Sequence, residues 1–478
     1  MLETVPVPIW MIVLVGVMAA WATLDPLLIP SVRWYLRRRV NRVINDLNTR
    51  LQLRIEPFRL TRRAVLIGRL TYDPEIMKAA EAEAEESGKP REAVVREVAR
   101  YAREIVPSFN AYAYFRVGYW LARQVARSLY RVRLGYTDPE RISAVPENAS
   151  VVFVMNHRSN MDYVLVGYLA ASTAALSYAV GEWARIWPLQ TLIRTLGAYF
   201  IRRKSGSLLY RKVLARYVQM ATEGGVVQAV YPEGGLSRDG RLREPRLGLL
   251  SCMVGAFDPA SGRDLIFIPV GINYDRVLED RTLLRSLDKE LPRIGTGSAL
   301  TKAFGFLGHQ IGLILRHRWH RFGYACVNFG TPISLTDYLA RSGTEFADEE
   351  ASERFDQIEA LGRHLMDAVG AVVPVTPVAL VATVLLTRDD QPVSEIKIKA
   401  SVFDLMKSLE AQGVQVYLSR ADRDYAVGVG LRMLLLRHMV LETDGLYRIN
   451  PDDRQLVAYY ANAIAHLPGV GAENDRSG

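Results

Sequence analysis

Short apolar runs alternate with longer amphipathic stretches from about residue 145 onward. The runs are rich in β-branched and aromatic residues, which is typical of buried strands. Because such runs alternate with segments of helix length, the pattern predicts an α/β domain with a mostly parallel sheet flanked by helices. The expected strands are SVVFVM (150–155), LSYAV (176–180), AYFIRR (198–203), VVQAVY (226–231), LIFIPVGINY (265–274) and YACVNFG (324–330).

Helical periodicity dominates on both sides of this block. Within the block, residues 207–225 predict a helix with Ser207 as its N-cap and a stop at Gly224 and Gly225. The patterns divide the chain into five parts. They are a membrane anchor (1–30), a helical N-terminal region (31–145), the α/β domain (146–338), a mainly helical C-terminal domain (339–470) and a disordered tail (471–478).

The anchor is predicted from an uncharged stretch of 20 residues, 5–24, which matches the length of a bilayer-spanning helix. Several arginines follow within residues 33–42, so the positive-inside rule predicts that the rest of the chain faces the cytoplasm. We therefore expect the protein at the inner (cytoplasmic) membrane. Pro6 and Pro8 lie within the stretch and Asp25–Pro26 follows it directly, which leaves a buried or interfacial helix as the alternative.

Two further segments are both oily and basic. Residues 111–135 mix aromatic side chains with arginines, and residues 301–322 do the same with phenylalanine and leucine. Each pattern fits a helix that lies in a lipid interface. Each fits a helix packed on protein equally well, so both alternatives stay open.

The charge balance points to an anionic partner. The 478 residues carry a formal net charge of +9, which suits a nucleic acid, an anionic lipid or a phosphorylated substrate. Only two cysteines occur, Cys252 and Cys326, far apart and without metal-ligand spacing. A reducing compartment is the natural interpretation.

The sequence NHRSNMD (156–162) places His157 and Asp162 directly after an expected strand. Five residues apart, they share no helix face, so they can meet only if His157 lies in the loop and Asp162 in the first helical turn. An imidazole oriented by a carboxylate is a general base for an alcohol. The sequence S-x-x-D from Ser159 to Asp162 is also a capping box, which would place Asp162 in that same turn.

Three basic residues, Arg202, Arg203 and Lys204, end another expected strand. Guanidinium groups bind phosphate or carboxylate in a bidentate manner, and ligands gather at the carboxyl ends of parallel strands. A phosphate site is therefore favoured over a solvated loop. Pro269 lies inside the apolar run 265–274, which indicates an edge or a bulge and a role in local shape.

The segment YPEGGLSRDGRLREPRLG (231–248) contains a tight turn of proline and glycines that exposes backbone N–H groups. It lacks the lysine and the spacing of a nucleotide P-loop, so we do not expect ATP or GTP binding. The side chains that can point inward from this turn are Glu233, Ser237 and Arg238. The remaining histidines show no metal-ligand spacing, and no metal or other cofactor is expected.

Together these blocks resemble a known family. NHRSNMD, GAYFIRR, YPEGGLSR and IPVGINYDRV, in this order and at these intervals, are similar to the four motifs of glycerolipid acyltransferases. The surrounding sequence resembles the membrane-bound bacterial glycerol-3-phosphate acyltransferases, most clearly in SGSLLYRKVLARYV, RLREPRLGLLS and VNFGTPISL. The likeness covers roughly residues 90–470 and implies the glycerolipid acyltransferase fold.

The resemblance implies acyl transfer from acyl-CoA or acyl-acyl-carrier-protein to the sn-1 hydroxyl of glycerol 3-phosphate. No metal and no covalent intermediate take part in the family's reaction. It also implies site roles: His157 as base, Asp162 as its orienting partner, and Arg203 with Arg202 and Arg158 on the acceptor phosphate. Glu233, Gly234, Ser237 and Arg238 would line the acceptor site, Pro269 would shape the pocket near the donor, and Ser159, Phe200, Ile201 and Lys204 join the substrate-binding candidates. A positively lined hollow beside the His157–Asp162 pair is therefore expected.

One motif departs from the family pattern. The third block reads P-E-G-G-L-S-R, with features of both lysophosphatidate and glycerol-3-phosphate acyltransferases, and Leu236 stands where the latter usually carry arginine. Lysophosphatidate and dihydroxyacetone phosphate therefore remain alternative acceptors.

A second class of function rests on residues 401–450, whose helix–helix–hairpin pattern is typical of a winged helix. DNA binding needs a concentrated basic field, and here acidic residues dilute it. The diluting residues are Asp422, Asp424, Glu442 and Asp444. A phospholipid membrane and no nucleic acid are thus the expected partners.

Overall fold

The computed structural model describes most of the chain from residue 53 onward. The described residues are 53–135, 137–181, 184–185, 189–202, 206–287, 322–343, 351–388, 391–414, 416 and 423–470. They belong to one compact unit that runs from Gln52 to Gly478. The predicted anchor, the oily segment 301–321 and the predicted tail lie outside the described residues.

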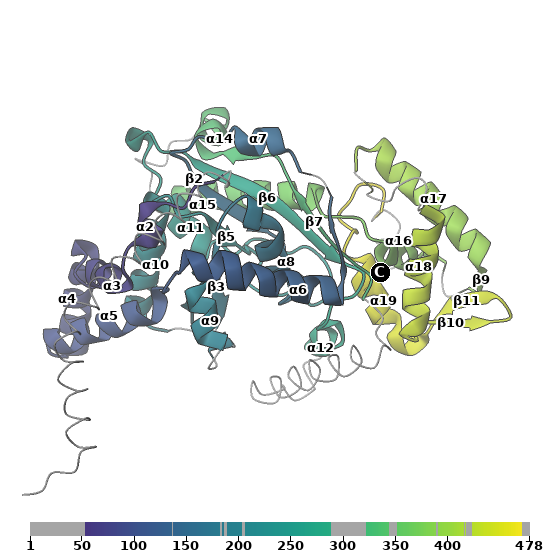
Figure 1. Cartoon of the computed structure of the whole chain (residues 1–478), viewed down its shortest axis with the longest axis horizontal. Coiled ribbons are helices and arrows are strands. Elements are labelled where there is room, and N and C mark those ends of the chain that lie inside the picture. The colour runs from purple at the N-terminus through teal and green to yellow at the C-terminus, as the bar shows by residue number, and fades with distance from the viewer. Residues whose placement is uncertain are drawn as a thin grey trace, which may run out of the picture. The chain divides into compact units, whose positions relative to one another are not determined.

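An eight-stranded sheet forms the centre of this unit (Figure 1). Its order is β1-β7-β6-β2-β5-β3-β4, with β8 paired to β6. All pairs are parallel except β6–β7 and β6–β8, so the predicted mostly parallel α/β sheet is confirmed. The strands are β1 (Arg131–Leu134), β2 (Ser150–Met155), β3 (Ser177–Gly181), β4 (Tyr199–Ile201), β5 (Gln228–Val230), β6 (Leu265–Tyr274), β7 (Tyr324–Phe329) and β8 (Ile333–Ser334).

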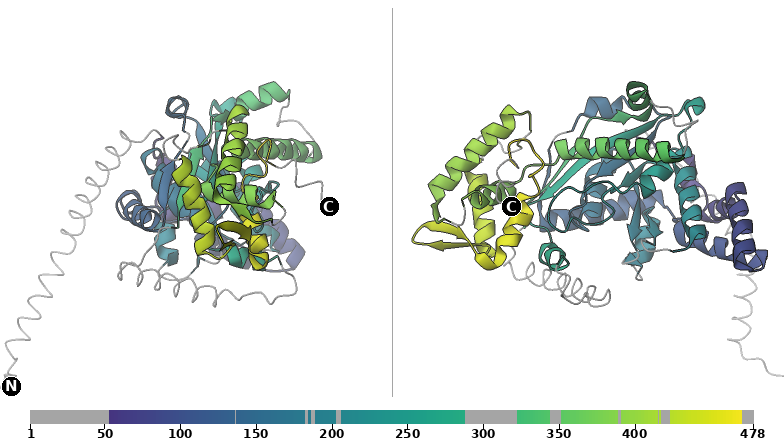
Figure 2. Two further views of the ribbon diagram at one scale, coloured as in Figure 1. Left: turned by 90° about the vertical axis from the view of Figure 1, so that its right-hand side faces the viewer. Right: turned by 180° about the vertical axis from the view of Figure 1, so that it is seen from behind.

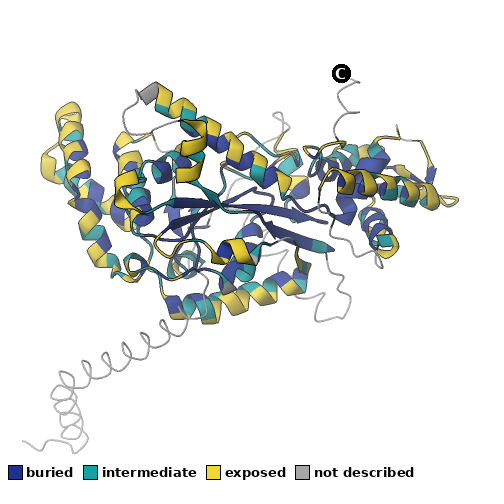
Figure 3. Cartoon of the chain, turned by 90° about the horizontal axis from the view of Figure 1, so that it is seen from above, coloured by how far each residue is buried: buried dark blue, intermediate teal, exposed yellow. Residues whose placement is uncertain are grey.

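Helices cover both faces of the sheet, and its central strands are buried between them (Figure 3). Because side chains alternate along a strand, Val152 and Val154 of β2 face one helical layer, while Phe153 and Met155 face the other. The first layer includes α3 (Arg63–Thr71), α4 (Pro74–Ser87), α5 (Arg91–Ile105), α10 (Leu208–Glu223), α11 (Gly248–Val254) and α15 (Ala351–Ala371). Figure 2 shows α15, in green, running along the sheet.

The second layer includes the helices nearest the candidate base. They are the π-helical turn η1 (Ala113–Gly118), α6 (Tyr119–Leu129) and α8 (Asp162–Leu169), with the 3-10 turn η2 (Ala170–Ser172) following α8. The remaining elements of the sheet region are α2 (Pro57–Leu60), α7 (Pro139–Ser143), α9 (Leu189–Thr195), η4 (Pro259–Ser261), α12 (Asp280–Arg285) and α14 (Leu335–Ser342).

Each predicted strand is present, and β2 and β6 have the predicted bounds. Ser207 caps α10 by accepting a hydrogen bond from the amide of Tyr210, as expected. The prediction of helix through residue 135 was wrong, because α6 ends at Leu129 and Arg131–Leu134 forms strand β1 beside β7. This edge strand is only four residues long and mostly exposed, so it shows no apolar run.

Pro269 does not lie on an edge strand, which corrects that part of the prediction. Strand β6 runs between β2 and β7, and Pro269 pairs with Val154 of β2. On its other side, β6 pairs with β8 through Phe267 and with β7 from Val270 onward. The carbonyl of Pro269 accepts from the amide of Gly330 on that side, so the missing N–H falls in the gap between the two partner strands.

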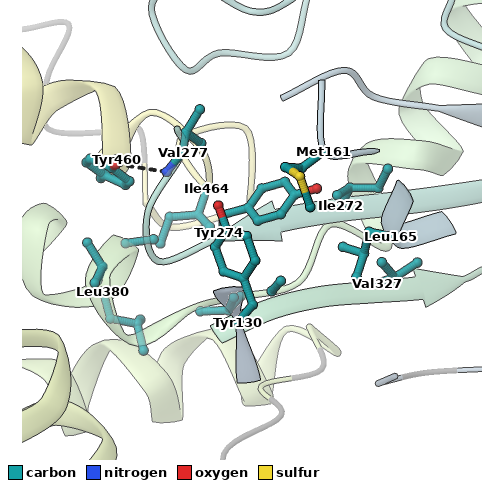
Figure 4. Close-up of a cluster of buried hydrophobic side chains, with 14 of the residues drawn as sticks. Tyr130, Met161, Leu165, Ile272, Tyr274, Val277, Val327, Leu380, Tyr460 and Ile464 are labelled. Carbon is teal, nitrogen blue, oxygen red and sulfur yellow. Dashed lines mark hydrogen bonds between the residues drawn. The ribbon is translucent and has the colours of Figure 1, made fainter. Parts of the chain in front are cut away.

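The C-terminal part combines helices with a small antiparallel sheet of order β10-β11-β9. Its elements are α16 (Pro377–Leu386), β9 (Val393–Ser394), α17 (Glu395–Ala411), α18 (Arg423–Leu436), β10 (Val440–Thr443), β11 (Leu446–Ile449), η6 (Pro451–Asp453) and α19 (Arg454–Ala461). The predicted helix–helix–hairpin is therefore present. In Figure 4, Leu380, Tyr460 and Ile464 of this part pack in one apolar cluster with Tyr130 and Tyr274.

No helix among the described residues combines the length and the apolar character needed to cross a membrane.

Candidate functional site

The candidate base lies in a turn at the centre of the sheet. Strand β2 ends at Met155 and helix α8 begins at Asp162, so His157 is in the loop and Asp162 is the first helical residue. Their side chains meet: Nδ1 of His157 lies 2.8 Å from Oδ2 of Asp162. The contact inferred from the five-residue spacing is present.

The Asp162 carboxylate is fully buried and held on both oxygens. Oδ2 also accepts from the backbone N–H groups of Arg158 at 2.7 Å and Ser159 at 3.0 Å, and Oδ1 accepts from the hydroxyl of Tyr274 at 2.7 Å. The bond to Ser159 is one half of a capping box. Because carboxylate oxygens only accept, Nδ1 of His157 carries the hydrogen and Nε2 keeps its lone pair.

Glu233 supports the same turn from the third motif. Its Oε1 accepts from the backbone N–H of His157 at 2.8 Å, while the amide of Ser237 donates to the carbonyl of His157 at 2.9 Å. Burial raises the pKa of Glu233 to about 7, and its Oε2 has no hydrogen-bond partner within the described residues. In this structure Glu233 and Ser237 therefore act on the backbone of the base.

Glu279, which follows β6, fixes the middle of the turn. Its carboxylate accepts from the Ser159 hydroxyl at 2.7 Å and from the side-chain and backbone nitrogens of Asn160 at 3.1 and 3.2 Å. Burial raises the pKa of Glu279, and its hydrogen bonds oppose that shift. Ser159 is thus engaged in shaping the turn.

Aromatic rings enclose the imidazole. Tyr231 stacks on His157 with 4.2 Å between ring centroids, and Tyr163 meets it edge-on at 5.5 Å. His157 is consequently only 2% exposed. Such an environment is low in dielectric, which strengthens the pairing with Asp162.

A hollow of about 250 Å³ adjoins the turn at Asn160 and Tyr163. It runs between α6, α8, α9 and the ends of β3 and β4, and its lining is almost entirely apolar. The lining includes Tyr114, Gly118, Tyr119, Leu121, Ala122, Val125, Val164, Gly167, Tyr178, Val180, Leu189, Leu192, Ile193, Leu196 and Ala198. Among the described residues, no arginine or lysine lines this hollow, so it does not supply the expected positive lining.

Arg158 lies beneath the turn and not in the hollow. It is 3% exposed, donates from Nη1 to the carbonyl of Gly240 and rests on the ring of Tyr459 at 5.0 Å. Its Nε and Nη2 have no partner in the described part of the chain.

The second motif lies three strands away from β2. Phe200 is fully buried in a small apolar cluster with Val180, and Ile201 is half-buried. Arg202 is bound by Glu104 of α5, with its Nε 2.8 Å from Oε1 and its Nη2 2.6 Å from Oε2. Arg203 and Lys204 lie outside the described residues.

The remaining candidates are placed as follows. Gly234 has a φ of 68°, and the side chain of Arg246 covers its Cα face, so a larger residue would be strained there. Arg238 is exposed. Pro269 is buried in β6, beside β2.

Several residues of this site were missed by the sequence analysis. Tyr274 lies in the fourth motif, Glu279 lies just after it, and Tyr231 is the first residue of the third. Asn156 bonds both backbone groups of Ile272 and so joins β2 to β6. Their positions inside quoted motifs were a signal, but their partners are too distant along the chain for spacing to reveal.

No group of three or more potential metal ligands lies together among the described residues.

Two family models match the chain. The model described as "Acyltransferase" matches residues 136–273, which contain His157 and Asp162. The model described as "Glycerol-3-phosphate acyltransferase C-terminal region" matches residues 310–468.

Curated relatives match most of the chain. A protein of Actinobacillus succinogenes named glycerol-3-phosphate acyltransferase is 28% identical over 431 residues, which are 86% of this chain and 50% of that protein. One of the same name from Pseudomonas paraeruginosa is 29% identical over 450 residues, 90% of this chain and 51% of that protein. The chain thus spans about half the length of the curated relatives it matches.

A crystal structure of the 1-acyl-sn-glycerophosphate acyltransferase PlsC from Thermotoga maritima aligns at 15% identity with a TM-score of 0.30, over 64% of this chain and 96% of that one. The two family models and the curated relatives agree with each other: the chain contains an acyltransferase domain and a glycerol-3-phosphate acyltransferase C-terminal region, and over most of its length it is similar to glycerol-3-phosphate acyltransferases.

Proposed function

We propose that this protein transfers a fatty acyl group from a thioester donor, acyl-CoA or acyl-acyl-carrier-protein, to the sn-1 hydroxyl of glycerol 3-phosphate. The product is lysophosphatidate, so the reaction is the first acylation of phospholipid synthesis. The names of the relatives support the acceptor. The chemistry is supported by the chain's own turn at His157.

The single observation that carries the proposal is the buried contact between His157 and Asp162. With Nδ1 donating to Asp162, the Nε2 lone pair takes the hydroxyl proton as the acceptor oxygen attacks the thioester carbon. An ester C–O bond forms, the C–S bond breaks, and the imidazolium returns the proton to the leaving thiolate. Asp162 stabilises the imidazolium between these steps.

The apolar hollow fits the donor's acyl chain. It begins at Asn160 and Tyr163, next to the imidazole, and continues between α6, α8 and α9. Transfer of a hydrocarbon chain from water into this apolar lining is favourable. A thioester whose chain enters this hollow would place its carbonyl at the hollow's mouth, beside the base.

The acceptor's phosphate requires cations, and we assign it to Arg202, Arg203 and Lys204 at the end of β4. Phosphate carries nearly two negative charges, which suits guanidinium groups. Arg158 lies beneath the turn. Its Nε and Nη2, which have no partner in the described part of the chain, can bind an anion or a water.

The setting of the reaction is also part of the proposal. An acyl donor and a lipid product place the enzyme at the cytoplasmic face of the inner membrane, held by residues 5–24 and in contact with phospholipid. The reaction proceeds without a metal or other cofactor, and nucleic acid is not a partner.

Acyl transfer by the purified full chain tests the proposal. Labelled acyl-CoA and acyl-acyl-carrier-protein would each be offered with glycerol 3-phosphate, dihydroxyacetone phosphate or lysophosphatidate, with His157→Ala as the inactive control. We expect product from glycerol 3-phosphate that depends on His157. Transfer to lysophosphatidate or dihydroxyacetone phosphate alone would overturn the assigned acceptor.

A further inference from the structure

Glu104, at the end of α5, binds three arginines, two through its carboxylate and one through its backbone carbonyl. It binds Arg202 through both oxygens, at 2.8 and 2.6 Å, and its Oε1 also accepts from Nη2 of Arg185. The backbone carbonyl of Glu104 accepts from Nη2 of Arg194 at 3.0 Å. We call Arg185, Arg194 and Arg202 the arginine cluster.

The cluster lies where a parallel sheet binds ligands. Arg185 follows β3, Arg202 follows β4, and Arg194 belongs to α9 between them. The carboxyl ends of these two strands therefore converge on Glu104, which comes from a helix outside every motif.

Aromatic rings fix the directions of the guanidinium groups. Arg185 and Arg194 lie over the ring of Phe200 at 5.8 and 5.4 Å. Arg202 lies over the rings of Tyr101 and Tyr210 at 5.4 and 5.2 Å. Stacking of this kind pre-organises arginine, so less side-chain entropy is lost when a ligand binds.

The charges of the cluster do not balance. The cluster holds three guanidinium groups and one carboxylate, which contacts Arg185 and Arg202, and no second carboxylate contacts the three arginines among the described residues. The Nε atoms of Arg185 and Arg194 are buried without a partner in the same part of the chain. An excess of about two positive charges matches the charge of a phosphate monoester near neutral pH.

The geometry of Glu104 leaves room for that ligand. Its two oxygens occupy the Nε–Nη2 edge of Arg202, so the Nη1 side of the same guanidinium stays available. The arginine is also one-third exposed, which admits a ligand from solvent. A purely structural ion pair would balance its charges and close both edges.

We propose that Glu104 is a positioning residue that orders Arg185 and Arg202 as the site for the acceptor's phosphate. This inference rests on the proposed function, because it assigns the cluster to glycerol 3-phosphate. It adds to that function a residue from the helical region that precedes the sheet.

The test is Glu104→Gln in the full chain, compared with Glu81→Gln. Glu81 pairs with Arg91 at 2.6 Å between α4 and α5, away from the cluster, so its variant matches the loss of one glutamate–arginine pair. We expect Glu104→Gln to raise KM for glycerol 3-phosphate about 10-fold, with kcat and the donor's KM within about 2-fold. Glu81→Gln should leave all three constants unchanged.

Two further variants keep the result decisive if Glu104→Gln folds poorly. Arg185→Gln removes one positive charge but keeps the Glu104–Arg202 contact, and it should also raise KM for the acceptor. Glu104→Asp keeps the charge and should recover part of the loss. Folded variants with unchanged acceptor KM, or with a raised donor KM instead, would overturn the inference.

Direct binding separates this inference from the proposed function. Titration of the wild-type chain with inorganic phosphate should show binding that Glu104→Gln weakens about 10-fold. If the chain fails to acylate glycerol 3-phosphate but shows this difference, the proposed function fails and the phosphate site remains. If acylation occurs and phosphate binding is equal in both proteins, the role of Glu104 fails alone.

Discussion

The hydroxyl of Tyr274 donates to Oδ1 of Asp162 across 2.7 Å, joining two motifs that lie 112 residues apart. The other carboxylate oxygen meets His157, so strand β6 holds the far side of the group that orients the base. In the proposed reaction the fourth motif therefore acts through Tyr274 as well as through the shape of its strand.

Tyr274→Phe should lower kcat by roughly 10-fold, because one neutral-to-charged hydrogen bond is lost while the ring stays packed. KM for both substrates should change little, since the hydroxyl touches Asp162 and not the hollow. Steady-state kinetics with each substrate varied would measure this. Tyr130→Phe is the matched control, because the Tyr130 hydroxyl bonds the carbonyl of Arg276 and leaves Asp162 untouched. Equal losses in the two variants would contradict the assignment.

His157→Ala should abolish turnover, and Asp162→Asn should lower kcat by about 10²–10⁴-fold. In one of its two orientations, the asparagine side chain would point its NH2 group at the Nδ1–H of His157, so that two donors face each other. The substitution would also disturb the hydrogen bonds that Asp162 accepts from the backbone N–H groups of Arg158 and Ser159. Circular dichroism and thermal melting should show that His157→Ala stays folded. A folded His157→Ala protein that turns over at the wild-type rate would remove the mechanism.

Apolar pattern predicted most of the sheet, because strands buried on both faces leave continuous apolar runs. β2 and β6 match their predicted bounds for this reason. β1 was missed, since an exposed four-residue edge strand, RVRL, has no such run and its pairing with β7 comes from far along the chain. For Pro269 the sequence predicted an edge or a bulge, because sequence cannot show that β6 changes partner at that residue.

The site was predictable where chemistry depends on short spacing and not where it depends on contacts between distant segments. His157 and Asp162 are five residues apart, and the turn between β2 and α8 brings them together. Glu104 and Arg202 are 98 residues apart, and Glu104 lies outside every motif, so no local pattern connects them. The lining of the hollow beside His157 was not predictable either, because which side chains surround a cavity is a tertiary property.

Gly118→Val should shorten the apolar hollow and shift preference toward shorter acyl donors. A Cβ at Gly118 would lie 2.5 Å from a methyl group of Leu196, which also lines the hollow, so added methyl groups must project into its space. Rates with a series of acyl-CoA chain lengths would show a larger loss for long chains than for short ones. Gly68→Val is the control, since Gly68 in α3 has open space around it. Equal losses at all chain lengths would argue against this hollow as the acyl site.

Glu233→Gln should keep activity and change how stability depends on pH. Burial raises the pKa of Glu233 from its ordinary 4.5 to about 7, so between these values the folded protein holds a proton that the unfolded chain has released. The free energy of unfolding of the wild type therefore falls as pH rises through this window. The variant lacks this loss and keeps an acceptor for the amide of His157. The melting temperature of the variant, relative to that of the wild type, should rise between pH 5 and about 7.5. A difference in melting temperature that stays constant over this range would show that Glu233 does not titrate there.

The double variant Arg437→Met/Asp280→Asn should lose less folding stability than the sum of the losses of the two single variants. Nη2 of Arg437 lies 2.6 Å from Asp280 at the start of α12, and Nη1 lies 2.8 Å from the hydroxyl of Tyr460 in α19. Both charged side chains are nearly buried, so removing one leaves the other unpaired at a cost of about 3–5 kcal/mol. Removing both avoids the stranded charge, and the double variant should recover at least about 1 kcal/mol relative to the sum of the single losses. Denaturant unfolding of the four proteins measures this coupling. The backbone N–H of Val277, two residues before Glu279, donates to the Tyr460 hydroxyl at 3.1 Å. The single variants should therefore also lower activity. Additive stability losses with normal activity would show that the C-terminal helices are not coupled to the catalytic turn.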